Sequence, residues 1–217
     1  MSDRSRTETR AEYAELARAL MARLVDRDLL ARDRLVIGIA GESGSGKSVT
    51  AMTLARALEA AGHPALVLHQ DDYFHLPPRI NHAAREALVS RVGPDEVNLL
   101  LLQSHVAAYR SGSEGVEKPE TNYATDRFEM RHVAFGDIAV LLIEGTYVLG
   151  LVDLDLRIFL AATYSDTRDR RRVRARDVDS AFVERVLAIE HDIIASQSVL
   201  ADLVVDVHFR ITAEQGR

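Results

Sequence analysis

Short runs of consecutive apolar residues recur along the chain and alternate with longer segments in which apolar positions follow helical spacing. The runs predict strands that are buried on both faces. Strands that alternate with helices are typical of an α/β fold, in which helices cover both faces of a parallel sheet. The predicted strands are residues 35–40, 65–69, 138–145, 156–162 and 203–209.

The segment 8–30 carries apolar residues Tyr13, Leu16, Leu20 and Leu24 at helical spacing, and it predicts an amphipathic helix before the first strand. The polar, turn-rich segment that follows the middle of the chain is compatible with a hairpin excursion. The further predicted helices are residues 47–61, 81–92, 94–110 and 180–200, and the hairpin candidate is residues 111–136.

Composition narrows the possible classes of protein. With 217 residues and 47% apolar content, the chain can form one sizeable core, so we expect one domain. The chain has no cysteine, which excludes disulfides and fits a reducing compartment. The net charge of −6 gives no support to a nucleic-acid partner. No apolar stretch is long enough for a membrane span or a signal core, so we expect a cytoplasmic protein; a homo-oligomer is compatible with the sequence.

A glycine-rich loop follows the first predicted strand. The sequence "GESGSGKS" matches the pattern G-x-x-x-x-G-K-[ST], whose backbone N–H groups cradle phosphates. Lys47 would reach the β and γ phosphates, and the Ser48 hydroxyl would bind Mg²⁺. A plain glycine turn is the alternative, but the strand–loop–helix context favours a nucleoside triphosphate site. The predicted cofactor-binding residues are Gly41, Glu42, Ser43, Gly44, Ser45, Gly46, Lys47, Ser48 and Val49.

Acidic residues follow two other predicted strands, at the sheet edge where ligands bind. In "HQDDYF", Asp71 is the candidate base that orients the acceptor hydroxyl, with a further role near the metal ion. Asp72, Tyr73 and Phe74 are candidates for the acceptor site, although an Asp-Asp turn and packed aromatic rings would explain them equally. In "VLLIEG", Glu144 would hold a water molecule on the metal ion, unless Glu-Gly is only a turn.

An arginine run, "DTRDRRRVRARD", precedes the last long helix. A solvated helix with i,i+4 pairs would explain it. Phosphoryl transfer, however, needs cations over the migrating group, and closing lids commonly supply them. Arg172 and Arg176 are four residues apart and share a helix face, so we expect that at least one arginine of the run acts on ATP.

Four motifs together resemble the uridine kinase and phosphoribulokinase group of small-molecule kinases, which includes the nicotinamide riboside kinases: "GESGSGKS", "HQDDYF", "LLIEG" and "RRVRARD". The resemblance implies a P-loop NTPase-type three-layer fold with a five-stranded parallel sheet, ATP and Mg²⁺ as cofactors, and a small alcohol as acceptor. It implies that Asp71 is the base and Glu144 the second acid. We therefore expect an N-terminal helix at 1–33 packed on a kinase domain at 34–217, with a lid near 164–180.

The departures from the family concern the acceptor. Uridine kinases carry D-H-P-D near the acceptor, and its first Asp binds ribose hydroxyls; the matching stretch here is "VGPD", with Val92 in that place. The Tyr and His that read the base are matched by Thr121 and Asp126. Tyr123 and Asp126 nevertheless remain candidates for acceptor contacts. We therefore expect the reaction to be kept and the nucleoside to be replaced.

Three functions remain open from the sequence. The leading one is an ATP-dependent kinase of the uridine kinase type. The second is a kinase of another alcohol, such as pantothenate or a sugar. The third is a regulatory protein that binds nucleotide without catalysis, against which the acidic residues and the arginine run argue.

Overall fold

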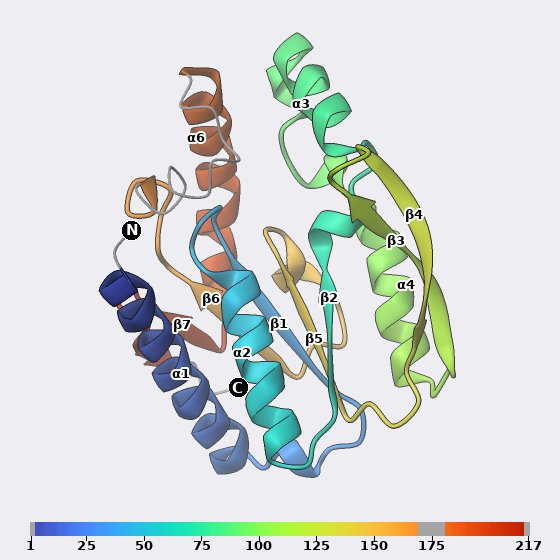
Figure 1. Cartoon of the computed structure of the whole chain (residues 1–217), viewed down its shortest axis with the longest axis vertical. Helices are drawn as coiled ribbons and strands as arrows, with labels where there is room; N and C mark the ends of the chain where they lie inside the picture. Colours follow the sequence, from blue (N-terminus) through green and yellow to red (C-terminus); the bar gives the residue numbers. More distant parts are fainter. Residues whose placement is uncertain (1–2, 169–180, 215–217) are drawn as a thin grey trace.

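The computed structural model describes residues 3–168 and 181–214, and the described part forms a three-layer α/β fold (Figure 1). Its central sheet has six strands in the order β2-β5-β1-β6-β7-β8. The first five are parallel, as predicted, and β8 is antiparallel to β7. The strands are β1 (Leu35–Gly41), β2 (Ala65–His69), β5 (Val140–Gly145), β6 (Leu156–Leu160), β7 (Leu203–Val205) and β8 (Ile211–Glu214).

The sixth strand corrects the prediction of a single last strand at 203–209. The chain reverses after β7 because the Asp206 carboxylate accepts hydrogen bonds from the N–H groups of His208 and Arg210. Phe209 completes the turn in a left-handed conformation, with φ 59°. A side chain that bonds its own backbone two residues on is a strong turn signal, and the reversal produces β8.

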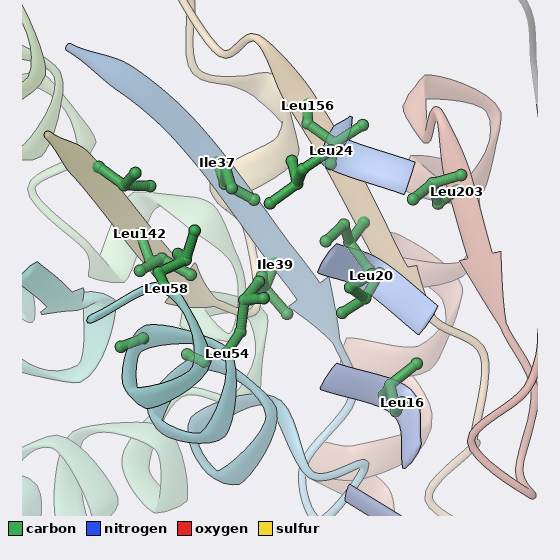
Figure 2. Packing of buried hydrophobic residues seen from close by; sticks show 14 of the residues in the cluster. Leu16, Leu20, Leu24, Ile37, Ile39, Leu54, Leu58, Leu142, Leu156 and Leu203 are labelled. Carbon is green, nitrogen blue, oxygen red and sulfur yellow. The ribbon is translucent and has the colours of Figure 1, made fainter. Parts of the chain in front are cut away.

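Two helices, α1 (Asp3–Asp26) and α2 (Lys47–Ala60), cover one face of the sheet (Figure 1). Figure 2 shows how α1 contributes to this core: Leu16, Leu20 and Leu24 point towards the leucine and isoleucine side chains of the sheet. The three leucines are fully or almost fully buried. The predicted leading helix is therefore part of the main core of the protein.

The opposite face is covered by α4 (Leu99–Arg110), by α6 (Ala181–Ala195) and by residues around the hairpin β3 (Gly115–Asn122) and β4 (Arg127–Ala134). The hairpin was predicted as an excursion, and it forms a separate two-stranded sheet. The helix predicted from residue 94 begins later, at Leu99, because the Asn98 side chain caps it by accepting the Leu101 N–H.

Above the carboxyl edge of the sheet, α3 (Pro78–Ala87) and α6 rise on either side (Figure 1). Their side chains meet, since the rings of His82 and Phe182 pack edge-to-face with centroids 5.5 Å apart. Within the described residues, no helix combines the length and apolar character needed to cross a membrane.

Candidate active site

The glycine-rich loop joins β1 to α2, as the sequence predicts. Gly41, Gly44 and Gly46 have φ values of 153°, 79° and 101°, which side-chain-bearing residues rarely adopt. A Cβ at Gly41 would lie 2.7 Å from the Leu160 carbonyl oxygen, and one at Gly46 would overlap the Tyr13 hydroxyl. Glycine is therefore required at both ends of the loop, and α1 supports the loop directly through Tyr13.

The polar side chains of the loop lie at the start of α2. Lys47 Nζ donates a hydrogen bond to the Glu42 carbonyl oxygen at 2.9 Å, and Ser48 Oγ donates to Glu144 Oε1 at 2.9 Å. The Ser45 hydroxyl is buried and has no partner among the described residues. Because the N-terminal end of a helix also attracts anions, this loop has the features of a phosphate site. Val49 lies one residue further along α2 and is partly exposed.

The acid at the end of β5 connects three elements. Glu144 Oε1 contacts both Ser48 Oγ and His69 Nδ1, the latter at 2.7 Å. Burial opposes ionisation, but the hydrogen bond with His69 and the positive charge of Lys47 hold the pKa of Glu144 below its usual value. The same bond raises the pKa of His69. Glu144 is thus an ionised oxygen donor beside the loop hydroxyl.

His69 is a site residue that the sequence reasoning missed. It is the last residue of β2, and β2 pairs with β5 so that His69 lies opposite Glu144. The sequence signal for His69 was its position at the carboxyl end of a predicted strand. The prediction assigned the site to the acids Asp71 and Asp72 instead. The register between the two strands is what reveals the pair.

Asp71 follows β2, and part of its surface is exposed although protein atoms surround its carboxyl group on most sides. Removal of water by the surrounding protein raises the pKa of Asp71, and so does the negative charge of Glu144. Lys47 and His69 oppose this shift. His69, two residues before Asp71, lies opposite Glu144 in the pairing of β2 with β5, so Asp71 follows β2 at the same edge of the sheet as the end of β5.

The two residues after Asp71 have structural partners. Asp72 is buried, with Oδ2 2.6 Å from Lys118 Nζ and Oδ1 accepting the Thr121 N–H at 2.9 Å. Tyr73 is 1% exposed, and its hydroxyl contacts His105 Nδ1 at 2.9 Å. These contacts attach the β3–β4 hairpin and α4 to the end of β2.

The other predicted acceptor contacts are Phe74, which follows Tyr73, and two residues of the turn between β3 and β4. Phe74 is partly buried, and the Arg85 guanidinium lies 6.0 Å from its ring centroid. Tyr123 is exposed in the turn between β3 and β4. In the same turn, Asp126 Oδ1 accepts the Arg79 N–H at the start of α3, at 2.9 Å. The structure therefore connects Asp126 to α3.

Most of the predicted lid lies outside the described residues. Arg172 and Arg176 belong to this undescribed part. The segment that leads to it is attached to the phosphate loop. Glu42 Oε2 accepts the Tyr164 N–H at 2.5 Å, and Thr167 Oγ1 donates to the Ser43 carbonyl at 3.0 Å. Glu42 Oε1 also contacts His191 Nδ1 of α6 at 2.6 Å. The loop is therefore bonded both to the segment before the predicted lid and to α6 after it.

A family comparison agrees with this geometry. Residues 36–188, which include all three acidic or glycine-rich motifs, match the model of the Phosphoribulokinase / Uridine kinase family. The chain belongs to this family. It is therefore a small-molecule kinase, a phosphotransferase that uses ATP.

Individual relatives of this kinase differ in their described acceptors. A uridine kinase of Listeria monocytogenes serotype 4a is 31% identical over 185 residues, covering 79% of this chain and 86% of the relative. The bifunctional alpha-galactosidase/sucrose kinase AgaSK of Mediterraneibacter gnavus is 30% identical over 190 residues. This match covers 81% of this chain but only 20% of AgaSK.

Solved structures resemble the kinase in fold. Phosphoribulokinase from Rhodobacter spheroides has a TM-score of 0.64 at 15% identity, covering 80% of this chain and 70% of that one. A candidate fructose transport system kinase from Silicibacter sp. TM1040 has a TM-score of 0.60 at 25% identity, covering 87% and 93%. The fold of the family is therefore retained, and its members differ in what they phosphorylate.

Proposed function

We propose that this kinase transfers the γ-phosphoryl group of ATP to a hydroxyl of a sugar or a similar non-nucleoside alcohol. The observation that carries the proposal is the state of the three positions that would bind a nucleoside in uridine kinases. Val92 is 6% exposed, and its side chain has no polar atom. Thr121 and Asp126 are engaged in contacts that hold the hairpin in place.

The hairpin contacts leave little capacity for reading a base. The Thr121 N–H bonds Asp72, and its hydroxyl donates to the Asp71 carbonyl oxygen at 3.1 Å. Asp126 Oδ1 accepts a hydrogen bond from the N–H of Arg79, in the first turn of α3. If Thr121 or Asp126 bonded a nucleoside instead, the bonds that attach the hairpin would be lost. The net gain in affinity for the nucleoside would therefore be small.

The reaction itself needs the residues around the phosphate loop. In this proposal Lys47 neutralises charge on the transferring phosphate, and Asp71 accepts the proton of the acceptor hydroxyl. The raised pKa of Asp71 favours proton uptake late in the transfer. Arg172 and Arg176 are proposed as lid cations on the same phosphate.

Mg²⁺ fits the oxygen donors at the loop. Ser48 Oγ and Glu144 Oε1 are a hydroxyl and a carboxylate, 2.9 Å apart, and hard oxygen donors are what Mg²⁺ prefers. These two residues, with Asp71 nearby, would hold the ion directly or through water. His69 would orient Glu144 in this arrangement. When bound there, the ion would neutralise negative charge on the nucleotide phosphates.

Two relatives support a sugar-like acceptor. The names of AgaSK, a bifunctional alpha-galactosidase/sucrose kinase, and of the candidate fructose transport system kinase each include a sugar. The match to the second protein covers 87% of this chain and 93% of that one. The uridine kinases of Listeria support the rival, a nucleoside, at similar identity. Sequence identity alone therefore does not separate the two, and the state of Val92 favours the sugar.

A coupled ATP-consumption screen tests the proposal, with sucrose, D-fructose, pantothenate, nicotinamide riboside, uridine and cytidine as acceptors. Asp71→Asn serves as the blank for acceptor-independent ATP consumption. Uridine and cytidine should be used at least about tenfold less efficiently than the best acceptor, because a lost charge-assisted hydrogen bond costs roughly 1.5–3 kcal/mol. Uridine turnover with kcat/KM of about 10⁴ M⁻¹s⁻¹ or more, within tenfold of the best acceptor, would contradict the proposal.

A further inference from the structure

A buried ionic cluster bridges α3 and α6 above the carboxyl edge of the sheet. Arg85 of α3 makes a bidentate contact with Glu96, at 2.7 and 2.8 Å, and its Nη2 also contacts Glu190 of α6 at 3.0 Å. Glu96 in turn accepts the Gly93 N–H at 3.0 Å. No local sequence pattern predicts this cluster, because Arg85 and Glu190 are 105 residues apart.

The members of the cluster differ in exposure. The Glu96 side chain is 2% exposed and has backbone and guanidinium partners, so it has a structural role. Arg85 and Glu190 keep 16% and 14% of their side chains exposed. The Arg85–Glu190 pair therefore retains partial contact with solvent, while Glu96 holds the arginine from within the protein.

Polar atoms without partners lie at the same edge. Tyr147 follows β5 and is 4% exposed, yet its hydroxyl has no hydrogen-bond partner among the described residues. Tyr147 packs in the same buried apolar cluster as Ile194 of α6, and Gln197, which follows α6, donates to the neighbouring Thr146 carbonyl oxygen at 2.7 Å. Burial and the negative charges of Glu190 and Glu96 raise the pKa of Tyr147, while Arg85 opposes the shift. Gln70, whose Oε1 accepts the Tyr147 N–H at 2.7 Å, also has an unpartnered buried Nε2.

Buried polar groups without partners are costly, and where they persist in a structure they often await a ligand or water. Here they are adjacent to the candidate base, since Gln70 directly precedes Asp71. Glu190 also feels the positive charge of Lys47 in the phosphate loop. His191, the next residue of α6, contacts Glu42 of the phosphate loop at 2.6 Å, and Arg85 belongs to α3, so the cluster connects the phosphate loop with α3.

We propose that Glu190 and Tyr147 bind hydroxyl groups of the acceptor, with Arg85 as the positioning residue for Glu190, and that the acceptor is a neutral polyol. This inference rests on the proposed function and specifies its substrate class. The Tyr147 hydroxyl can donate a hydrogen bond to a sugar hydroxyl or accept one from it. Glu190 accepts such bonds when it is ionised, and it can also donate one when it is protonated.

The charge of the cluster decides against an anionic acceptor. One arginine faces two glutamates, so the three residues carry one excess negative charge when both acids are ionised. Lys47 is engaged by the nucleotide phosphates in the proposed function. With Glu190 protonated the three charges cancel, so in neither state does the cluster offer excess positive charge to a carboxylate or phosphate group, whereas a hydroxyl needs none.

The test uses Tyr147→Phe and Glu190→Gln, each measured with the acceptor that the wild-type protein phosphorylates best, whichever class it belongs to. We expect KM for that acceptor to rise about 3- to 10-fold for Tyr147→Phe and about 10-fold or more for Glu190→Gln, with KM for ATP unchanged. Tyr109→Phe and Asp155→Asn are the matched controls, because Tyr109 is a buried tyrosine of α4 and Asp155 pairs with Arg32 and Arg110 away from the loop. The controls should leave both KM values unchanged.

A second arm compares neutral and anionic acceptors in matched pairs: D-fructose with D-fructose 6-phosphate, and glycerol with D-glycerate. The neutral member of each pair should be the better substrate. Unchanged acceptor KM in both variants, or preference for an anionic member, would overturn this inference while the kinase still acts on a sugar. A nucleoside as the best acceptor would overturn the proposed function instead, and the variants would still test the cluster. Absence of phosphorylation of every acceptor would overturn both.

Discussion

At the scale of single residues, Lys47 has the most specific role in the proposed reaction. Its ammonium is held by the Glu42 carbonyl oxygen, within the loop that would cradle the phosphates. Lys47→Ala should lower kcat by about 10²- to 10³-fold, because one aimed charge contributes about 3–4 kcal/mol to the transition state. The measurement is steady-state kinetics beside a thermal unfolding curve, which should be unchanged within a few degrees. Near-normal turnover by this variant would contradict the role given to the loop.

The two adjacent acids should separate into one chemical and one structural role. Asp71→Asn should lower kcat by about 10²- to 10⁴-fold while ATP still binds, because it removes the proton acceptor. Asp72→Asn should have a milder effect on kcat but should destabilise the protein by about 3–5 kcal/mol, since it leaves Lys118 without its buried partner. Kinetics and thermal unfolding of both variants check this.

A pH profile provides the control for that pair. Because the pKa of Asp71 is raised above 3.8, the fraction of ionised base falls as the pH decreases through the raised value. On the acid side of the profile, the pH at which kcat/KM falls to half should therefore be higher than for an ordinary aspartate. The Asp72→Asn variant should show the same midpoint. If Asp72→Asn had the larger effect on kcat, the base would be Asp72.

At the scale of elements, α1 is part of the core and also supports the loop through Tyr13. Leu20→Ala removes a fully buried side chain from α1 and should destabilise the protein by about 2–5 kcal/mol. Val25→Ala, on the exposed side of the same helix, should change stability by less than about 0.5 kcal/mol. Chemical denaturation of both variants gives the comparison, and equal losses would mean that α1 does not contribute to the core as described.

At the scale of the whole molecule, the sheet order brings the site together. β1 lies between β5 and β6, and β2 pairs with β5, so the loop after β1, Asp71 after β2 and Glu144 at the end of β5 share one edge. The rule that ligands bind at the carboxyl ends of parallel strands predicted this meeting from sequence. The added strand β8 changes the far edge of the sheet and not the site.

The sequence by itself determined the local elements and the family. Apolar runs predict strands because a buried strand must be apolar on both faces, and the glycine loop is recognisable because its backbone conformation allows few other residues. Both constraints act on residues that are neighbours in the chain, so the sequence pattern alone reveals them. The five parallel strands, the phosphate loop and the acids at the strand ends were all accessible in this way.

Only the tertiary structure decided which residues beyond those motifs meet. His69 reaches Glu144 through the register of β2 with β5, Asp72 is committed to Lys118 by the position of the hairpin, and Arg85 meets Glu190 where α3 and α6 converge. Each partner lies 46 or more residues away, and no local pattern encodes that distance. Packing of the layers sets these contacts, because a charged side chain can be buried only where the fold provides its partner.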